Sequence, residues 1–238
     1  MRRSIAIGIA LVLAAGGAAL ARAGTSSPGS GGGVDPSNFV RHVTNSYFPL
    51  KPGTVWVYRG IKDGRVQIDR VTATHQTRKI EGVTATAVRD VATHGKHVLE
   101  ATTDWYAQDK QGNVWYFGEA TKAYENGKVD TSGSWLAGRD NARPGIIMEA
   151  DPKVATAYRQ EYYKGQAEDQ AWVVQRGGHV RVPYGTVRHI LFTLEWSRLE
   201  PNVIDRKDYA PGIGIVKEIS ASGPRETANL VRVQRSGR

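Results

Sequence analysis

The sequence predicts an all-β protein, a single antiparallel meander curled into a half-barrel or a sandwich, with one short N-terminal helix and one long loop. Two observations predict this fold. Runs of β-branched and aromatic residues recur along the chain, and short turn signals separate them. Short strands joined by tight turns are typical of antiparallel sheets that curl on themselves.

The first 23 residues read as a secretory signal peptide. Arg2 and Arg3 precede an apolar run from Ile5 to Leu20, and Ala21-Arg22-Ala23 supplies small residues two apart. A basic start, an apolar centre and an A-x-A end mark a cleaved export signal. A membrane anchor is the alternative, but the run is rich in Gly and Ala and shorter than the roughly 20 apolar residues that a span needs. We therefore expect a secreted or periplasmic protein, cleaved near Ala23.

Residues 24–34 are expected to form a flexible linker, because a segment of Gly, Ser and Thr cannot bury apolar surface. A single β-rich domain is expected over 35–238. It begins with a short helix at Asp35-Pro36, where Asp caps the first turn and Pro fits the first helical position. Pro49 and Pro52-Gly53 then break the chain before the first strand.

From Thr54 onward the chain reads as strands. Thr54–Arg59 alternates two valines with Trp56 and Tyr58, and Asp63-Gly64 is a hairpin turn signal. The other expected strands are Arg65–Thr74, Val83–Val91, Val98–Gln108, Asn113–Gly118, Tyr158–Lys164, Asp169–Gln175, Val187–Trp196, Ile213–Ile219 and Leu230–Val233.

One stretch, Gly133–Pro152, lacks strand alternation and is expected to be a long loop. It carries Trp135, Ile146, Ile147 and Met148, so it is not simply polar. Loops of this length in compact domains are often lids or binding loops. The two interpretations are a lid over a binding site and an ordered crossover that plugs one end of a barrel.

Composition narrows the classes of partner. The chain carries a formal net charge of +9 and contains no cysteine. Disulfides, thiol catalysis and a lipid-modified N-terminal cysteine are therefore excluded. Basic residues are dispersed, with a local excess in Arg225, Arg232, Arg235 and Arg238. They indicate either a solvated edge or peripheral contact with anionic polymer or lipid of the cell envelope. No basic stripe with aromatic partners indicates nucleic-acid binding.

The densest feature is a predicted hairpin over Asp104–Glu119. Adjacent side chains on a strand point to opposite faces, so Trp105 and Tyr106 cannot both face one core. An apolar ligand such as a lipid would cover one face; alternatively, the rest of the fold covers both. The candidate ligand-binding residues are aromatic or aliphatic side chains of the hairpin and the long loop: Tyr106, Trp115, Phe117, Trp135, Ile147 and Met148.

Acidic residues suggest a second candidate site. Glu161, Glu168 and Asp169 cluster in sequence, and Asp104 and Glu119 are candidates to join them in space. Several carboxylates can bind calcium or act as an acid–base pair. Ion pairs with the surplus of Lys and Arg are the simpler interpretation.

Other motifs give little evidence for a particular chemistry. His94 and His97 flank a tight turn, which is weak evidence for a metal site. The sequence contains no G-x-S-x-G, H-E-x-x-H or P-loop. We predict no catalytic residue, no metal and no cofactor, and we favour a binding protein over an enzyme.

Two stretches carry a resemblance. They are Phe48-Pro49-Leu50-Lys51-Pro52-Gly53-Thr54-Val55-Trp56-Val57-Tyr58 and Tyr209-Ala210-Pro211-Gly212-Ile213-Gly214-Ile215-Val216-Lys217-Glu218. Together they resemble the opening and closing elements of a family of exported bacterial β-rich proteins of uncharacterised function. Some proteins with this opening resemble lipoprotein-carrier half-barrels, which implies a groove for an apolar ligand. The resemblance brings no catalytic residue with it.

Three functions are compatible with these observations. The first is a non-enzymatic binding protein whose concave sheet holds an apolar ligand. The second is a structural or interaction domain of the cell envelope with a filled core and no ligand. The third is a hydrolase that uses Glu161, Glu168 or Asp169, which requires two carboxylates roughly 5–10 Å apart in a cleft if the chemistry is glycosidic.

Overall fold

The computed structural model describes residues 34–62 and 64–235. The predicted signal peptide (1–23), its cleavage site near Ala23 and all but the last residue of the predicted linker (24–34) lie outside the described residues. The described chain is almost entirely β-structure, with one short 3-10 helix, η1 (Pro36–Asn38). No helix in these ranges is long and apolar enough to cross a membrane.

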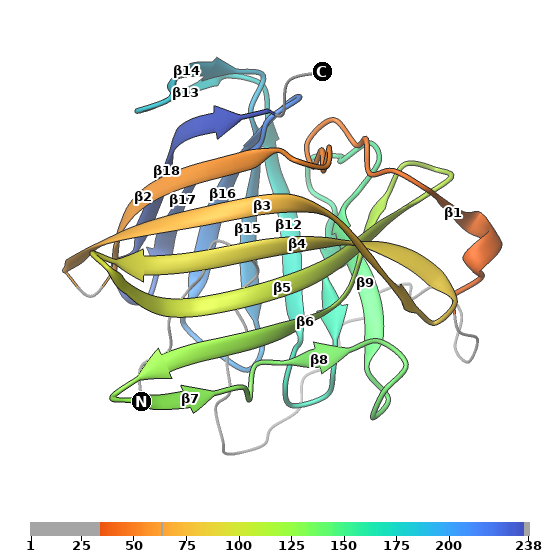
Figure 1. The fold of residues 1–238 in the computed structure, drawn as a ribbon. Coiled ribbons are helices and arrows are strands. Elements are labelled where there is room, and N and C mark those ends of the chain that lie inside the picture. Colours follow the sequence, from red (N-terminus) through yellow and green to blue (C-terminus); the bar gives the residue numbers. More distant parts are fainter. Residues whose placement is uncertain (1–33, 63, 236–238) are drawn as a thin grey trace.

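The first half of the chain builds one wall of a curved antiparallel sheet (Figure 1). Its strands follow one another as a meander, each paired with the next along the chain. They are β2 (Val55–Lys62), β3 (Arg65–Ile80), β4 (Val83–His94), β5 (His97–Asp109) and β6 (Val114–Glu125). Short strands β1 (Phe39–Val40), β7 (Lys128–Asp130) and β8 (Trp135–Leu136) pair with β5 or β6.

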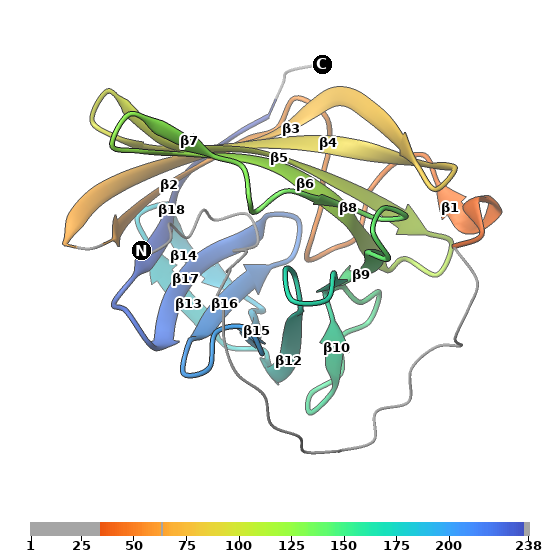
Figure 2. The same cartoon turned by 90° about the horizontal axis from the view of Figure 1, so that it is seen from below.

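The second half forms the opposite wall, and the sheet curves around between them (Figure 2). β18 pairs with β2, so the last and the first long strands lie side by side. The strands of this wall are β12 (Asp169–Arg176), β15 (Leu191–Ser197), β16 (Ile204–Ala210), β17 (Gly214–Ser222) and β18 (Thr227–Gln234). A separate hairpin of β13 (His179–Val182) and β14 (Gly185–Arg188) lies beside them.

One continuous segment joins the two ends of the sheet. β10 (Ala157–Arg159) pairs with β12, and β11 (Glu161–Tyr162), one residue later, pairs with β9 (Arg143–Met148). Gly145 on β9 permits this close approach, because a Cβ there would lie 2.5 Å from the backbone of Gln160. The sheet is thus nearly closed into a barrel, which confirms the predicted all-β antiparallel fold and the short N-terminal helix.

The predicted long loop is only partly a loop. Gly133–Pro152 contains β8 and β9, and β9 extends the sheet beyond β6 with Trp115 opposite Ile146. The prediction of a long loop therefore does not hold for the residues of β8 and β9. Their apolar side chains do not alternate clearly because Ile147 and Met148, neighbours in sequence, are both buried.

Among the strands that the sequence missed, β16 is the longest. β16 reads Ile-Asp-Arg-Lys-Asp-Tyr-Ala, with four charged residues in seven, and so shows no apolar alternation. The predicted strand Val187–Trp196 is in fact two, β14 and β15, separated at His189, whose φ of 58° lies in the left-handed region. A strand break at a non-glycine residue leaves no obvious signal in the sequence.

The aromatic hairpin β5–β6 is covered on both faces by the protein itself. On the outer face, Phe39 packs edge-on against Trp115 and Phe117, with ring centroids 6.0 and 5.5 Å apart. On the inner face, Tyr106 stacks on Tyr116 at 4.9 Å. The N-terminal segment that carries Phe39 therefore supplies the cover that the sequence left open.

Candidate functional site

The interior of the curved sheet is lined with carboxylates. Strand alternation places one side chain in two on the concave face, and acidic residues occupy that face on nine different strands. Eight are buried and two, Asp169 and Asp205, are half-buried. The ten are Asp69, Asp90, Glu100, Asp104, Glu119, Glu161, Asp169, Glu195, Asp205 and Glu218.

Two buried lysines are the cations of this interior. Lys207 on β16 lies 2.8 Å from Glu195 on β15, and the carboxylate also accepts hydrogen bonds from Tyr209 at 2.8 Å and Thr193 at 2.9 Å. Burial opposes the ionised form of Glu195, but these partners together lower its pKa. Lys62 on β2 lies 3.8 Å from Glu226. Two ammonium groups are therefore fewer than the ten carboxyl groups of the interior.

A hydrogen-bonded row crosses β5 and β6. Asp104 and Glu119 are directly paired across the two strands, and the Tyr116 hydroxyl donates to Asp104 at 2.8 Å. Thr121 donates to Glu119 at 2.7 Å. Burial raises the pKa of Asp104 to about 7 despite the Tyr116 hydrogen bond. Burial, and then the Asp104 charge, raise the pKa of Glu119 well above its usual value.

Glu161 is the most enclosed carboxylate. Its side chain is fully buried, and neither oxygen has a hydrogen-bond partner. Burial raises its pKa well above the usual value, and the charges of Asp169 and Glu119 add to the shift. The Trp135 indole, close to it, favours the ionised form without reaching hydrogen-bond geometry. Burial also raises the pKa of Asp169 to about 7.

An apolar pocket lies in the interior, lined mainly by side chains of β2–β5, β16, β17 and the segment before β2. Its cavity volume is about 60 Å³. Lys207, Asp90 and Asp104 are the charged residues of its lining, and the indole of Trp56 in its wall is fixed by a 2.7 Å hydrogen bond to the Ile213 carbonyl. The apolar lining is Phe48, Pro49, Leu50, Trp56, Tyr58, Val71, Val88, Tyr106, Ile147, Tyr209, Ile213 and Ile215.

Two smaller polar cavities lie among the interior carboxylates. One, of about 20 Å³, is lined by Lys62 and Asp69, and the other, of about 30 Å³, by Asp169, Glu195 and Lys207. Asp205 and Glu218 line both. Burial raises the pKa of Glu218 to about 8, opposed by the positive charge of Lys207. Lys207 is also part of the apolar pocket's lining, so the apolar and polar spaces share this side chain.

The structure separates the predicted ligand-binding residues into two groups. Tyr106 and Ile147 line the apolar pocket. The other four do not belong to its lining. Trp115 and Phe117 pack against Phe39 on the outer face, and Trp135 and Met148 are buried in the core, Trp135 edge-on to Tyr116 at 5.2 Å.

The predicted acidic cluster largely converges. Asp104, Glu119, Glu161 and Asp169 all face the interior and influence one another's ionisation. Glu168 does not take part in this group. Its carboxylate accepts a hydrogen bond from the Gly165 amide at 2.9 Å and lies 3.6 Å from the exposed Arg198.

Sequence reasoning missed the other six interior carboxylates and both lysines. The available signal was alternation: Asp90 lies between Val88 and Ala92, and Lys207 is two residues from Tyr209, all on one face of a strand. A charged residue in a strand reads as an ordinary surface position from the sequence alone. Only the curvature of the sheet shows that these faces all point inward.

The arrangement has two chemical capacities. A carboxyl group with a pKa near 7 can gain or lose a proton close to neutral pH. A chamber with more carboxylates than ammonium groups attracts cations. Within residues 34–62 and 64–235, no cluster of three or more His, Cys, Asp or Glu has the geometry to hold a metal ion. The His94 ring instead forms a 2.7 Å hydrogen bond with the Val66 carbonyl.

No protein-family model matches the chain, and no curated protein sequence matches it. Two solved structures are similar. One is a protein thought to be exported, with a YMCC-like fold, from Bacteroides fragilis NCTC 9343, at 16% identity and a TM-score of 0.47 over 80% of this chain and 100% of that one. The other is a proposed lipoprotein from Parabacteroides distasonis ATCC 8503, at 13% identity and a TM-score of 0.45 over 80% of this chain and 99% of that one. Likeness of this degree carries no conclusion about ligand or activity, because function resides in particular side chains.

Proposed function

We propose that the protein is exported to the periplasm or the exterior and acts there as a non-enzymatic binding protein that takes up an apolar group of a small molecule or lipid. One observation carries the proposal. The apolar pocket combines a mainly apolar lining with three charged side chains, Asp90, Asp104 and Lys207. A small number of polar groups in a mainly apolar pocket is typical of ligand sites.

The size of the pocket limits what enters it. A cavity of about 60 Å³ is smaller than the roughly 150 Å³ that accommodates benzene in an engineered protein cavity. The pocket therefore suits one short or branched apolar end, with the rest of the ligand outside. A whole acyl chain of a lipid does not fit the pocket in this conformation.

Nuclear magnetic resonance tests the proposal directly. The Trp56 indole N–H reports on the pocket, because it lines the wall and donates to Ile213. Titration with 1-hexanol should shift this resonance saturably. Val71→Phe, which fills the pocket, should abolish the shift, whereas Val57→Phe on the outer face of the neighbouring strand should not. Absence of a saturable shift in the unmodified protein would leave the structural, ligand-free interpretation.

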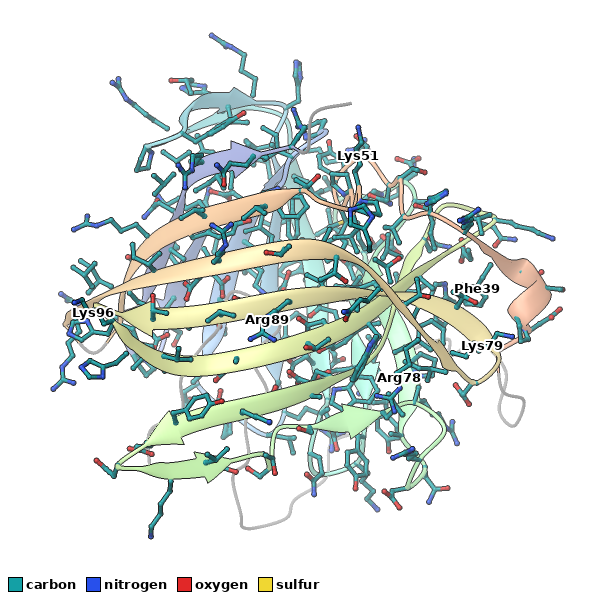
Figure 3. The ribbon with its side chains drawn as sticks, in the orientation of Figure 1. Phe39, Lys51, Arg78, Lys79, Arg89 and Lys96 are labelled. Atoms are coloured by element: carbon teal, nitrogen blue, oxygen red, sulfur yellow. The ribbon has the colours of Figure 1, made fainter. Side chains whose placement is uncertain are left out.

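Charge on the outer surface supports an envelope location. β2 and β18 contain no acidic residue, and the acidic residues of β3 and β4, Asp69 and Asp90, both face inward. The outer face of these four adjacent strands therefore presents arginines without carboxylates; Figure 3 shows Arg89 on this face. We propose that this face makes peripheral contact with anionic lipid. Its exposed arginines are Arg59, Arg70, Arg89 and Arg232.

A further inference from the structure

Exposed apolar side chains gather at one end of the outer wall. Of the ten large apolar residues that are exposed in the described chain, five lie beside the β2–β3, β4–β5 and β6–β7 turns. Figures 1 and 2 both place these strand ends at one end of the barrel. The five residues, here called the apolar end, are Ile61, Val66, Val98, Tyr124 and Val129, each with 39–55% of its surface exposed.

The strand register places the apolar end on the outer face. Ile61 is paired with Val66, and Tyr124 with Val129, and directly paired residues of antiparallel strands project to the same side of the sheet. Val98 is paired with Thr93, which follows the buried, inward-facing Ala92 and therefore projects outward. The five side chains thus face away from the interior of the barrel.

The same face carries cations close to the apolar end. Arg59 and Arg70 lie two and four residues from Ile61 and Val66, on the same side of their strands because strand side chains alternate. Figure 3 shows Lys96 at the β4–β5 turn. Within the described parts of β2, β3, β4 and β18, no carboxylate faces outward. Apolar and basic side chains are therefore combined here without acidic ones.

We infer that the apolar end inserts into the head-group region of an anionic bilayer while the neighbouring cations contact the lipid phosphates. The inference rests on the envelope contact proposed above. It adds the mode of attachment, namely which end of the barrel faces the membrane and which side chains enter it.

Each residue type at this end suits the membrane interface. Exposed aliphatic side chains leave water favourably. Tyr124 has an apolar ring and a hydroxyl group that stays hydrated at the level of the head groups. Arginine and lysine keep their charged groups at the phosphates while their apolar stems lie along the inserted surface.

Charge distinguishes a bilayer from a second copy of the chain as the occupant of this face. A symmetric contact between two copies through it would bring Arg59 and Arg70 of both copies together. Like charges at short range oppose such a contact, whereas an anionic bilayer attracts the same arginines. The face is therefore suited to lipid.

A triple variant tests the contribution of the apolar end at constant net charge. Ile61→Thr, Val66→Thr and Val98→Thr keep the β-branching that suits a strand but add a hydroxyl group at each position. Binding to vesicles of 30 mol% phosphatidylglycerol in phosphatidylcholine should weaken by at least about fivefold. The matched control, Val154→Thr with Trp172→Thr, changes two exposed apolar residues before β10 and on β12, and its binding should stay within about twofold.

A single label tests insertion without the triple variant. The chain contains no cysteine, so Val66→Cys gives one site for an environment-sensitive nitrobenzoxadiazole label. With the same vesicles, its emission should shift to shorter wavelength and be quenched by lipids with a nitroxide high on the acyl chain. A label at Thr72→Cys, on the same face of β3 but six residues from Val66, should respond less. A label at Val154→Cys should not respond.

The possible outcomes separate the inference from the proposed function. Unchanged binding by the triple variant, with a silent label at Val66, would indicate a purely electrostatic contact and overturn the inference while the envelope contact stands. A Val66 label that responds to protein concentration without vesicles would assign the apolar end to a second copy and also overturn it. Failure of the unmodified protein to bind these vesicles would remove the envelope contact itself.

Discussion

The ammonium of Lys207 and the carboxylate of Glu195 lie 2.8 Å apart inside the barrel, on adjacent strands β16 and β15. Both side chains are buried, at 5% and 6% exposure. Separating two charges from water is costly, and their attraction offsets that cost only when geometry and hydrogen bonds are favourable. Tyr209 and Thr193 supply those hydrogen bonds.

Removing one partner of this pair should lower the stability of the protein far more than removing both. Lys207→Met leaves Glu195 as an uncompensated buried charge and should lower the free energy of unfolding by about 3–5 kcal/mol at pH 8. The loss should be smaller at pH 5, because Glu195 can then protonate. The double variant with Glu195→Met should recover part of the stability. Denaturant unfolding at both pH values measures this, and an equal loss at each pH would contradict it.

The protein should lose stability as pH rises through neutrality. The folded-state pKa values of Asp69, Glu100, Asp104, Asp169 and Glu218 are raised by burial to about 6, 7, 7, 7 and 8. Between pH 4 and these values the folded state binds more protons than the unfolded chain, so the free energy of unfolding falls with rising pH, by up to about 1.4 kcal/mol per pH unit for each group.

From pH 5 to pH 8 we expect a loss of at least about 2 kcal/mol, which lowers the melting temperature by about 5 °C or more. Asp104→Asn should raise the melting temperature at pH 8 and change it little at pH 5, since it removes a charge that forms only at the higher pH. Thermal melting across this range measures both effects. A melting temperature that rises from pH 5 to pH 8 would show that these groups ionise as freely as in water.

Trp115 should matter for stability and not for ligand binding. Its ring packs on Phe39 on the outer face, and its indole N–H donates to Asp109 at 2.8 Å. Trp115→Ala should lower the free energy of unfolding by about 2–4 kcal/mol while the Trp56 response to 1-hexanol persists. Trp115→Phe separates the lost hydrogen bond from the lost packing. Loss of the hexanol response in a variant that remains folded would place Trp115 in the ligand site instead.

The outer basic face should bind anionic vesicles. Replacing Arg59, Arg70 and Arg89 by Ser removes three charges from adjacent strands, each worth about 1 kcal/mol at an anionic surface. Binding to vesicles with 30 mol% phosphatidylglycerol should fall by about a hundredfold and should weaken with added salt. The matched control removes three exposed charges elsewhere, with Lys164, Arg181 and Arg188 replaced by Ser. An equal fall in both variants would indicate net charge alone rather than this face.

Export should leave Gly24 as the first residue. The leader pattern of Arg2-Arg3, the apolar run and Ala21-Arg22-Ala23 predicts cleavage after Ala23. Intact mass and N-terminal sequencing of protein from its native host measure the mature terminus. A mature species that retains Ile5–Leu20 would favour a membrane anchor.

The sequence by itself determined the fold class, most strands and the position of the short helix, because turn residues and period-two alternation are local signals. It also indicated that Asp104, Glu119, Glu161 and Asp169 belong together. It failed at β16, where four charged residues hide the strand, and at β8 and β9, where apolar residues do not alternate.

Only the tertiary structure decided which faces point inward. A charged strand residue such as Asp90 or Lys207 looks like a surface residue, because the burial of its face depends on strands more than 100 residues away in sequence. The same applies to the aromatic hairpin. Phe39 covers its outer face, so the apolar pocket lies elsewhere, between β2–β5 and β16–β17, where long-range curvature brings Tyr106, Ile147 and Tyr209 around one space.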